Sequence, residues 1–336
     1  MPTSREREKV HFVSGGTRCA AWHYPGDNGA CVVMAGGFAV TKEPGTDPFA
    51  KRFHEAGFGV LAFDYRRFGE SGGQPRQVAS IRGQLADWQA AIEFAGTLPG
   101  VDPARLAGWA FSVSGGHVLR VAARSPRPAG PGLAAVIAQT PNVDGPIVLR
   151  AAARYQTSLA LLRLAGRGIL DALGGAVGRP PLLVPLAGAR GTVALLATPD
   201  APEGDRALNP DNIHPDWQQA VAARSTLALG WYRPGRDAHR VRCPILIVVC
   251  DQDRTALAEP AVAVARRAPH AELLRVPGGH YAPFTSAHEQ VVEAELTFLR
   301  RHLSKAVPTA ADPAADFDPA AAEFAPAAAD PRGRAR

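Results

Sequence analysis

Several features that are missing from this sequence exclude whole classes of protein. Its most apolar stretch, residues 157–175, is interrupted by Arg163, Arg167 and Asp171 and falls short of the roughly 20 apolar residues that a membrane span requires. The first ten residues are charged, and no apolar run follows them, so nothing there resembles a signal peptide. We therefore expect a cytoplasmic protein with no membrane partner.

Motifs for metals, nucleotide cofactors and nucleic acids are also missing. The four cysteines lie far apart or inside apolar runs, without a C-x-x-C pair, and we expect buried thiols. The sequence contains no H-E-x-x-H, G-x-G-x-x-G or G-x-x-x-x-G-K-[ST]. The net charge is +6, but the arginines are scattered and no basic run is interleaved with aromatic residues. We expect no metal, no cofactor and no nucleic acid partner.

The apolar residues are grouped in short runs that are typical of buried strands. Six runs are apolar on both faces: 31–36, 59–65, 105–111, 133–139, 244–250 and 272–277. Stretches with helical periodicity lie between them or after the last one: 47–57, 80–98, 114–126, 259–268 and 286–303. This alternation predicts an α/β fold with a mostly parallel central sheet flanked by helices.

The alternation stops between Asp144 and Arg242, where helical patterns and Pro/Gly turns replace the strands. A segment inserted after a central strand lies above the carboxyl edge of the sheet, where α/β proteins bind ligands. We expect this segment to set substrate choice without supplying catalytic groups, with Leu162 and Trp231 as candidate lining residues. The predicted organisation is a core of residues 1–143 and 243–303, a helical cap of residues 144–242, and a disordered Ala/Pro-rich tail of residues 304–336.

The stretch RLAGWAFSVSGGH, residues 105–117, contains the candidate nucleophile. A nucleophile elbow is a tight turn that lifts a serine above the sheet, and it needs small residues on both sides. Ser112 directly follows the apolar strand and has Ala110 and Ser114 as small neighbours. We predict that Ser112 is the nucleophile. The alternatives are that Ser114 has this role or that the serines only cap the helix.

Two loops after the predicted cap contain the partners that a serine nucleophile needs. A serine hydroxyl is a weak nucleophile near neutral pH, so a histidine must take its proton and a carboxylate must orient that histidine. Asp253 lies three residues beyond the strand at 244–250, and His280 follows a Gly-Gly turn after the last strand. We predict Asp253 and His280 for these roles. Asp251 is expected to support the turn, and Asp144 is the competing acid.

The oxyanion that forms during acyl transfer needs hydrogen-bond donors that are already in place. One candidate is the backbone N–H of Val113, directly after the nucleophile. The other lies in the loop MAGGFAVTKE, residues 34–43, where the N–H of Phe38 is the first candidate and that of Ala39 the second. Gly36 and Gly37 either shape this oxyanion loop or form a simple turn.

Five stretches resemble, in order, the motifs of the α/β-hydrolase superfamily: residues 32–45, 60–73, 106–119, 243–253 and 276–284. They are similar to its oxyanion loop, D-x-R-G-x-G-x-S-x-G turn, elbow, acid loop and histidine loop, and the resemblance covers most of residues 10–303. The order Ser112, Asp253, His280 is the order of this superfamily. The sequence departs from the superfamily motifs at two places: the oxyanion loop has Gly36-Gly37 in place of the usual His-Gly, and the elbow reads A-x-S-x-S in place of G-x-S-x-G. The serine nucleophile argues against a haloalkane dehalogenase.

The resemblance is greatest to bacterial serine hydrolases with a helical cap, including esterases and relatives found beside polyketide pathways. It implies a serine hydrolase that cleaves a carboxylic ester or thioester of a moderately apolar acyl group through an acyl-enzyme on Ser112. The substrate would be a small molecule or a carrier-bound acyl group. Two alternatives stay open: an acyltransferase that uses the same triad in a secondary-metabolite pathway, and a non-catalytic binding module on a hydrolase fold.

Overall fold

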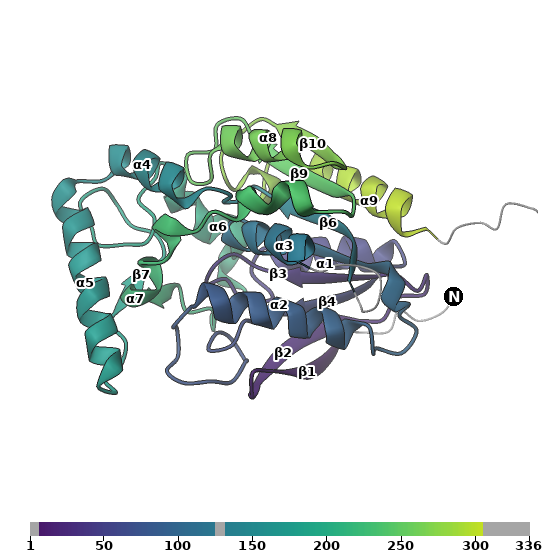
Figure 1. Cartoon of the computed structure of the whole chain (residues 1–336), viewed down its shortest axis with the longest axis horizontal. Coiled ribbons are helices and arrows are strands. Elements are labelled where there is room, and N and C mark those ends of the chain that lie inside the picture. The colour runs from purple at the N-terminus through teal and green to yellow at the C-terminus, as the bar shows by residue number, and fades with distance from the viewer. Residues whose placement is uncertain (1–6, 125–131, 305–336) are drawn as a thin grey trace, which may run out of the picture. The chain divides into compact units, whose positions relative to one another are not determined.

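The structure is a computed structural model that describes residues 7–124 and 132–304, and its central element is an eight-stranded sheet (Figure 1). The strand order is β1-β2-β4-β3-β5-β6-β9-β10. The six strands from β4 to β10 pair in parallel, and β1 and β2 add an antiparallel edge. The strands are β1 (Glu8–Ser14), β2 (Thr17–Tyr24), β3 (Cys31–Ala35), β4 (Gly59–Phe63), β5 (Leu106–Phe111), β6 (Leu133–Gln139), β9 (Ile245–Cys250) and β10 (Ala271–Val276).

The predicted α/β fold with a mostly parallel sheet is confirmed, and each of the six predicted strands is present within two residues at either end. Alternate residues of a strand point to opposite faces, and here both faces are covered by helices. In β9, Ile245 and Ile247 belong to the core layer beneath α2 (Ile81–Ala95), α3 (Val113–Arg124) and α8 (Ala258–Arg267). Leu246 belongs to the opposite layer, beneath α1 (Thr46–Glu55) and α9 (His288–Leu303).

The antiparallel hairpin of β1 and β2 was not among the predicted strands. Its turn consists of Gly15 and Gly16, which have positive φ values of 54° and 76°, between the paired residues Ser14 and Thr17. A Gly-Gly pair between two strands is a hairpin signal that the sequence does contain. The strand pattern itself is weak because β1 lies at the sheet edge, where Val13 is 68% exposed.

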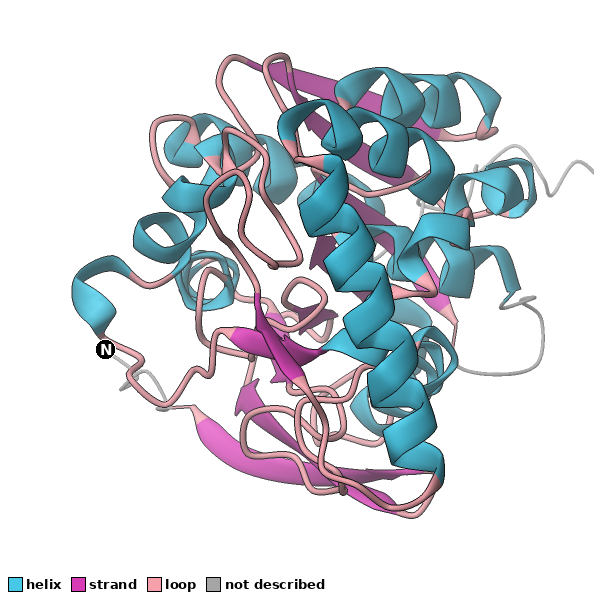
Figure 2. Cartoon of the chain, turned by 90° about the vertical axis from the view of Figure 1, so that its left-hand side faces the viewer, coloured by secondary structure: helices cyan, strands magenta, loops and turns pink. Residues whose placement is uncertain are grey.

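Residues 144–242 connect β6 to β9, which are neighbours in the sheet. Figure 2 shows the longest helix of this segment, α5, lying across the face turned to the viewer. The segment also contains a small two-stranded sheet that was not predicted. Its helices and strands are α4 (Gly145–Tyr155), α5 (Ser158–Ala176), β7 (Leu183–Pro185), α6 (Gly204–Leu208), β8 (Ala220–Ala222) and α7 (Ala223–Thr226).

Short 3₁₀ helices complete the described elements: η1 (Pro103–Arg105), η2 (Ala201–Glu203), η3 (Pro210–Asn212), η4 (Leu229–Trp231), η5 (Pro234–Arg240) and η6 (Ala282–Phe284). In the part of the chain that the structure describes, no helix combines the length and the apolar character needed to cross a membrane. The predicted disordered tail lies, apart from Ser304, outside the described residues.

Three of the four cysteines are buried as expected: Cys19, Cys31 and Cys250. Burial raises the pKa of the Cys19 and Cys31 thiols to about 12, because the thiolate would lose its hydration. Cys243 is partly exposed. A raised thiol pKa leaves little thiolate at neutral pH, so Cys19 and Cys31 are poor nucleophiles and serve as small core residues.

A carboxylic acid lies in the core between α9 and β5. Glu295 is fully buried, and its Oε2 accepts a hydrogen bond from the indole N–H of Trp109 at 3.0 Å. Its Oε1 has no hydrogen-bond partner among the described residues. Burial raises the pKa of Glu295 well above its ordinary value of 4.5. At pH values between the unfolded and the folded pKa, the native state therefore holds a proton that the unfolded chain releases.

We predict that Glu295→Gln stabilises the protein at neutral pH but not in acid. A carboxyl with a raised pKa contributes full stability below its unfolded pKa, and that contribution is lost as the pH rises towards the folded pKa. Glutamine keeps the acceptor for Trp109 and cannot ionise. The melting temperatures of wild type and Glu295→Gln should coincide at about pH 4 and separate towards pH 8. The separation should be roughly 2 °C for each kcal/mol of difference in the free energy of unfolding.

The matched control is Glu293→Gln on the exposed side of the same helix, where the side chain is 58% exposed. This control loses an exposed ion pair with Arg52, which contributes little to stability, and should show no comparable dependence on pH. A difference between wild type and Glu295→Gln that stays constant from acid to neutral pH would contradict the assignment of a buried, protonated Glu295.

Candidate active site

A strained turn holds Ser112 between β5 and α3. Ser112 has a φ of 58°, in the left-handed region that residues other than glycine rarely adopt, and α3 begins at the next residue. Its N–H donates to the carbonyl of Gln139 at 3.0 Å, and its carbonyl accepts from the N–H of Asn142 at 2.9 Å. The end of β6 and the chain that follows it therefore hold this conformation.

Small residues after the turn allow the backbone of α3 to approach the chain that leaves β6. A Cβ at Gly115 would lie 2.9 Å from the Cβ of Pro141, and one at Gly116 would collide with the carbonyl of Asn142. Any larger side chain at either glycine would push the helix away from the neighbouring chain. The Gly-Gly pair that follows the serines in the sequence is thus required by packing.

The structure brings the three side chains of the predicted triad together at the carboxyl edge of the sheet. Ser112 Oγ is 3.1 Å from Nε2 of His280, and Nδ1 of His280 is 2.7 Å from Oδ2 of Asp253. The other carboxylate oxygen of Asp253 accepts from the N–H groups of Thr255 at 2.8 Å and Ala256 at 2.7 Å. Asp253 and His280 are both buried, so their hydrogen bonds are shielded from water.

The competing residues have other partners. Ser114 is buried, and its Oγ lies 2.7 Å from the hydroxyl of Tyr65. Asp144 caps α4 through the N–H of Ile147 and forms an ion pair with Arg233. Asp251, expected to support the turn, forms an ion pair with Arg275 of β10. Of the serines and acids that were weighed, the structure brings only Ser112 and Asp253 to His280.

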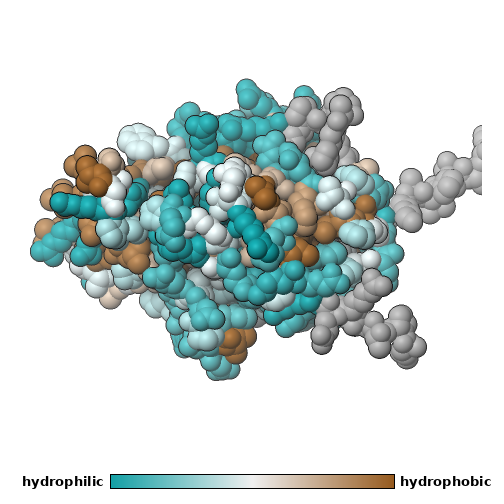
Figure 3. All heavy atoms as spheres, turned by 90° about the horizontal axis from the view of Figure 1, so that it is seen from below, coloured by the Kyte–Doolittle hydropathy of each residue, from teal (hydrophilic) through white to brown (hydrophobic). Residues whose placement is uncertain are grey.

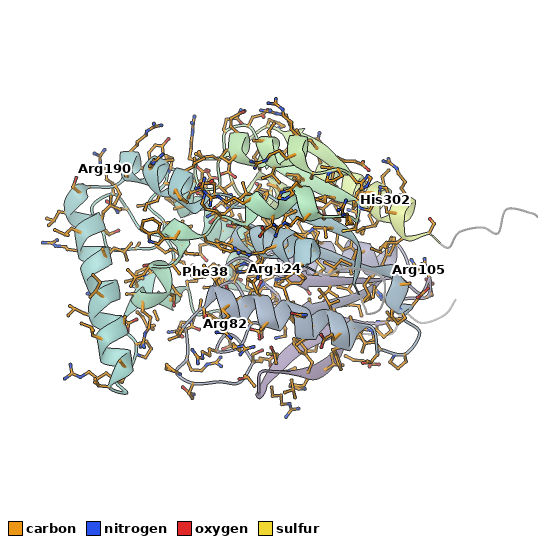
Figure 4. The ribbon with its side chains drawn as sticks, in the orientation of Figure 1. Phe38, Arg82, Arg105, Arg124, Arg190 and His302 are labelled. Atoms are coloured by element: carbon orange, nitrogen blue, oxygen red, sulfur yellow. The ribbon has the colours of Figure 1, made fainter. Side chains whose placement is uncertain are left out.

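One candidate oxyanion donor follows Ser112 directly in the chain, and the other belongs to a residue that lines the same cavity. Val113 is the first residue of α3, and N–H groups in the first turn of a helix have no intrahelical acceptor. Phe38 and Ala39 line the same cavity as Ser112. Phe38 lies at the edge of the sheet that faces residues 144–242 (Figure 4). A Cβ at Gly37 would lie 3.1 Å from the ring of Phe111, so glycine permits this loop to pack against the end of β5.

A buried chain of hydrogen bonds braces the loop at Phe38. Gln84 Nε2 donates to the carbonyl of Phe38 at 2.7 Å, so its Oε1 is left to accept from Nε2 of His117, 3.0 Å away. Nδ1 of His117 then accepts from the hydroxyl of Tyr232 at 2.8 Å. Burial lowers the pKa of His117 to about 3, so the ring is neutral at physiological pH and this donor pattern is fixed.

The residues of this brace come from three distant parts of the sequence. Gln84 is on α2, His117 is on α3, and Tyr232 follows η4 near the end of the segment 144–242. Phe38 itself is in the loop after β3. The brace was not predicted, because no local motif connects these positions. It supports the loop that has Gly-Gly where the resemblance to the α/β-hydrolase motifs implies His-Gly.

Asp200 is a second residue that the sequence did not point to. Its Oδ2 accepts from the backbone N–H of His280 at 3.1 Å and from that of Arg254 at 2.8 Å. Its neighbour Thr198 makes a hydroxyl–hydroxyl hydrogen bond of 2.7 Å with Thr255. The segment 144–242 was expected to supply no catalytic groups, and in the structure its residue Asp200 links the acid loop to the histidine loop through their backbones. It touches the triad residue His280 only at its main chain.

A mostly apolar cavity opens beside Ser112. It has about 570 Å³ of empty space, including open solvent at its mouth. Residues 144–242 supply more than half of its lining, which includes Leu186, Leu195, Leu196, Leu208 and Trp217. Two suggested lining residues are elsewhere: Leu162 and Trp231 do not line the cavity and are 70% and 84% exposed. An apolar stretch in the sequence does not show which of its faces is turned inward.

The geometry of the site agrees with the comparison to protein families. A model of the alpha/beta hydrolase family matches residues 28–294, and the chain belongs to this family. Within residues 7–124 and 132–304, no group of three or more His, Cys, Asp or Glu side chains is arranged to hold a metal ion.

Several relatives have names that refer to quorum quenching, to a thiohydrolase or to a polyketide transferase. The chain is 38% identical over 302 residues to the quorum-quenching protein AidA of Acinetobacter baumannii, covering 87% of this chain and 94% of that protein. It is 26% identical over 294 residues to thiohydrolase aneE of Aspergillus aculeatus, covering 81% and 86%. It is 34% identical over 187 residues to polyketide transferase ATR5 of Stachybotrys chlorohalonatus, covering 55% and 58%.

A solved structure, that of DcsB in complex with its substrate analogue, has the same fold. The TM-score is 0.74, and the match covers 89% of this chain and all of that chain at 20% identity. At this identity the likeness establishes the fold alone.

We predict that Gln84→Leu lowers the free energy of unfolding by about 2–4 kcal/mol. The change leaves two buried groups without partners, the Phe38 carbonyl and the His117 N–H, and each unpaired group costs roughly 1–3 kcal/mol. Denaturant unfolding measures the loss. The control is Gln89→Leu on the exposed face of the same helix, which should change stability by less than about 0.5 kcal/mol. Equal effects of the two substitutions would show that the brace is not formed.

Proposed function

We propose that this protein is a serine hydrolase that cleaves a carboxylic ester or thioester of a moderately apolar acyl group through an acyl-enzyme on Ser112. The observation that carries the proposal is the hydrogen-bonded series Ser112 Oγ, His280 Nε2, His280 Nδ1 and Asp253 Oδ2. Membership of the alpha/beta hydrolase family and the hydrolase and transferase names of its relatives support an enzyme of this general kind.

In the first half of the proposed reaction, Ser112 Oγ attacks the substrate carbonyl carbon while Nε2 of His280 takes the hydroxyl proton. The carbonyl oxygen becomes an oxyanion, which accepts hydrogen bonds from the N–H groups of Val113 and Phe38. The intermediate then expels an alcohol or a thiol, and His280 returns the proton to that leaving group. Asp253 stabilises the imidazolium and keeps its Nδ1 proton directed away from Ser112.

In the second half, water takes the place of the leaving group. His280 removes a proton from the water as the water oxygen attacks the acyl carbon on Ser112. The second tetrahedral intermediate collapses, the bond to Ser112 Oγ breaks, and the proton passes back to the serine. The products are a carboxylic acid and the original enzyme.

The two buried supports fit this scheme. Gln84 holds the Phe38 carbonyl, and this fixes the loop that contains the proposed oxyanion donor. Asp200 accepts hydrogen bonds from the backbone N–H groups of His280 and of Arg254, the residue next to Asp253. These bonds fix the distance between the acid Asp253 and the base His280. Preorganised donors and bases cost no rearrangement at the moment of reaction.

We assign residues 144–242 as the cap that selects the acyl group, inserted between core segments 1–143 and 243–303. Its leucines supply apolar walls of the cavity beside Ser112, which suits an acyl chain and not a charged one. The leaving group would be a small alcohol, a thiol or a carrier thiol. The cytoplasmic location expected from the sequence stays a prediction.

Acyl transfer is the second candidate function, favoured by the likeness to a polyketide transferase. The same acyl-enzyme would then react with an alcohol or an amine in place of water, and an apolar cavity lining that keeps water out would favour this outcome. Product analysis separates the two functions. At millimolar concentrations of an alcohol or amine acceptor, the rate of acyl transfer to the acceptor is compared with the rate of hydrolysis. A faster transfer than hydrolysis would favour the transferase.

We predict that Ser112→Ala reduces ester hydrolysis by roughly 10⁴-fold or more, because it removes the nucleophile. Asp253→Asn should cost a similar factor, since the histidine tautomer would be wrong. The matched control is Ser114→Ala, which removes a buried hydroxyl beside Tyr65 and should keep most of the activity. Steady-state hydrolysis of a p-nitrophenyl ester measures all three. Equal losses for Ser112→Ala and Ser114→Ala would overturn the proposal.

We also predict that hydrolysis of p-nitrophenyl esters rises with acyl length and then falls. Each buried CH₂ adds roughly 0.8 kcal/mol, or about fourfold in kcat/KM, until the cavity is full. Leu196→Trp narrows the cavity and should move the optimum to shorter chains. Leu162→Trp, on the exposed side of the cap, is the control and should leave the optimum unchanged. A flat profile in wild type would show that this cavity does not receive the acyl chain.

A further inference from the structure

The segment 144–242 exposes an unusual amount of apolar surface. Among the described residues, thirteen of the fifteen large apolar side chains that are exposed lie in it. Isolated apolar residues on a surface are ordinary, but a contiguous group marks an interaction site. Six of the thirteen lie on α5 or at its C-terminal cap: Leu159, Leu162, Ile169, Leu170, Leu173 and Val177.

These six residues form one stripe along α5, which we call the α5 stripe. Their spacing of mostly three or four residues puts them on a single side of the helix. The opposite side, with Ala160, Gly168 and Asp171, is buried against the rest of the segment. At 1.5 Å per residue the helix is roughly 28 Å long. Figure 3 shows apolar atoms gathered at the end of the described body where α5 lies.

The exposed charged residues of 145–198, the stretch of chain that contains the α5 stripe, have one sign. Residues 145–198 contain six arginines and a single acidic residue, Asp171. Asp171 is buried and paired with Arg224, so it does not neutralise the surface. All six arginines are exposed, and none takes part in the salt bridges of the described residues. They are Arg150, Arg154, Arg163, Arg167, Arg179 and Arg190, the last of which is labelled in Figure 4.

This combination decides which partner fits. A second copy of the chain, packed stripe against stripe, would bring Arg163 and Arg167 of each copy together, with no exposed carboxylate from residues 145–198 between them. An apolar helix face bordered only by arginine is instead the pattern of helices that lie flat in the interface of an anionic bilayer. The leucines enter the acyl boundary, and the arginines contact the phosphate and carboxylate groups of the lipids.

We propose that the α5 stripe and its bordering arginines bind the surface of a bilayer that contains anionic lipids. The sequence has no segment that could span a membrane, and on that ground we expected no membrane partner. A helix that lies flat on the surface of a bilayer needs no spanning segment, so that expectation does not apply to it. The unpartnered face is visible only in the fold, because the sequence does not show that the buried side of α5 is already filled by Ala160 and Gly168. The proposal is independent of the proposed function, since it concerns binding without turnover.

Flotation with lipid vesicles tests the proposal directly. Wild-type protein should float with vesicles of phosphatidylcholine and phosphatidylserine at a ratio of three to one, and at least tenfold less with phosphatidylcholine alone. Binding should weaken as salt is raised. Arg163→Gln and Arg167→Gln should each weaken binding by roughly fivefold. Leu162→Glu combined with Leu173→Glu should abolish it.

Val13→Glu is the matched control, because Val13 is 68% exposed on β1 and Leu162 is 70% exposed on α5. This variant should bind vesicles as wild type does, and thermal melts check that every variant is folded. Failure of wild-type protein to float, or equal losses for Val13→Glu and the α5 variants, would overturn the proposal. A dimer in solution that the α5 double variant turns into a monomer, without vesicle binding, would identify a second copy as the occupant and also overturn it.

Discussion

The strained backbone of Ser112 is the constraint on which the rest of the site depends. A residue with a side chain adopts a φ of 58° only where its surroundings hold it there. Here the end of β6 and the chain that follows it do so through two backbone hydrogen bonds. The same turn forces Gly115 and Gly116 against the chain after β6. Because Ser112 is fixed above the sheet edge, His280 and Asp253 reach it from loops that follow two neighbouring parallel strands, β10 and β9.

Buried polar groups then set the positions of the surrounding loops. The hydrogen bonds of Tyr232, His117 and Gln84 lead to the carbonyl of Phe38, and the carboxylate of Asp200 accepts from the backbone N–H of His280. Both of these supports include a residue from the segment 144–242, Tyr232 in the first and Asp200 in the second. This segment therefore does more than cover the site, because it also completes the hydrogen bonding of the core loops. Replacing the whole segment 144–242 would therefore disturb the loops that contain Phe38 and His280 as well as the substrate pocket.

Much of this arrangement was predictable, because the signals are local. The six central strands are apolar on both faces, which marks them as buried strands. Ser112, Asp253 and His280 each follow the end of one of these parallel strands, so all three lie at the carboxyl edge of the sheet. Glycines beside the serine and the histidine marked the turns. The N-terminal hairpin was missed although its Gly-Gly turn is visible, because β1 is half exposed and its pattern is weak.

The unpredicted parts depend on contacts between distant residues. Asp200 is separated from His280 by 80 positions, and Gln84 from Phe38 by 46, so no spacing rule connects them. The inward and outward sides of the cap helices were also not evident. Leu162 and Trp231 are apolar in sequence but exposed in the fold, whereas Leu196 and Trp217 line the cavity. Packing of one element against another decides these assignments.

The proposed chemistry depends on Ser112, activated by His280, as the nucleophile. A fluorophosphonate probe bonds to an activated serine and needs no knowledge of the substrate, so the full-length protein should be treated with this probe and analysed by peptide mass spectrometry. We expect a single adduct on Ser112 that is lost when His280 is replaced by alanine. An adduct on Ser114, or no adduct on a folded protein, would contradict it.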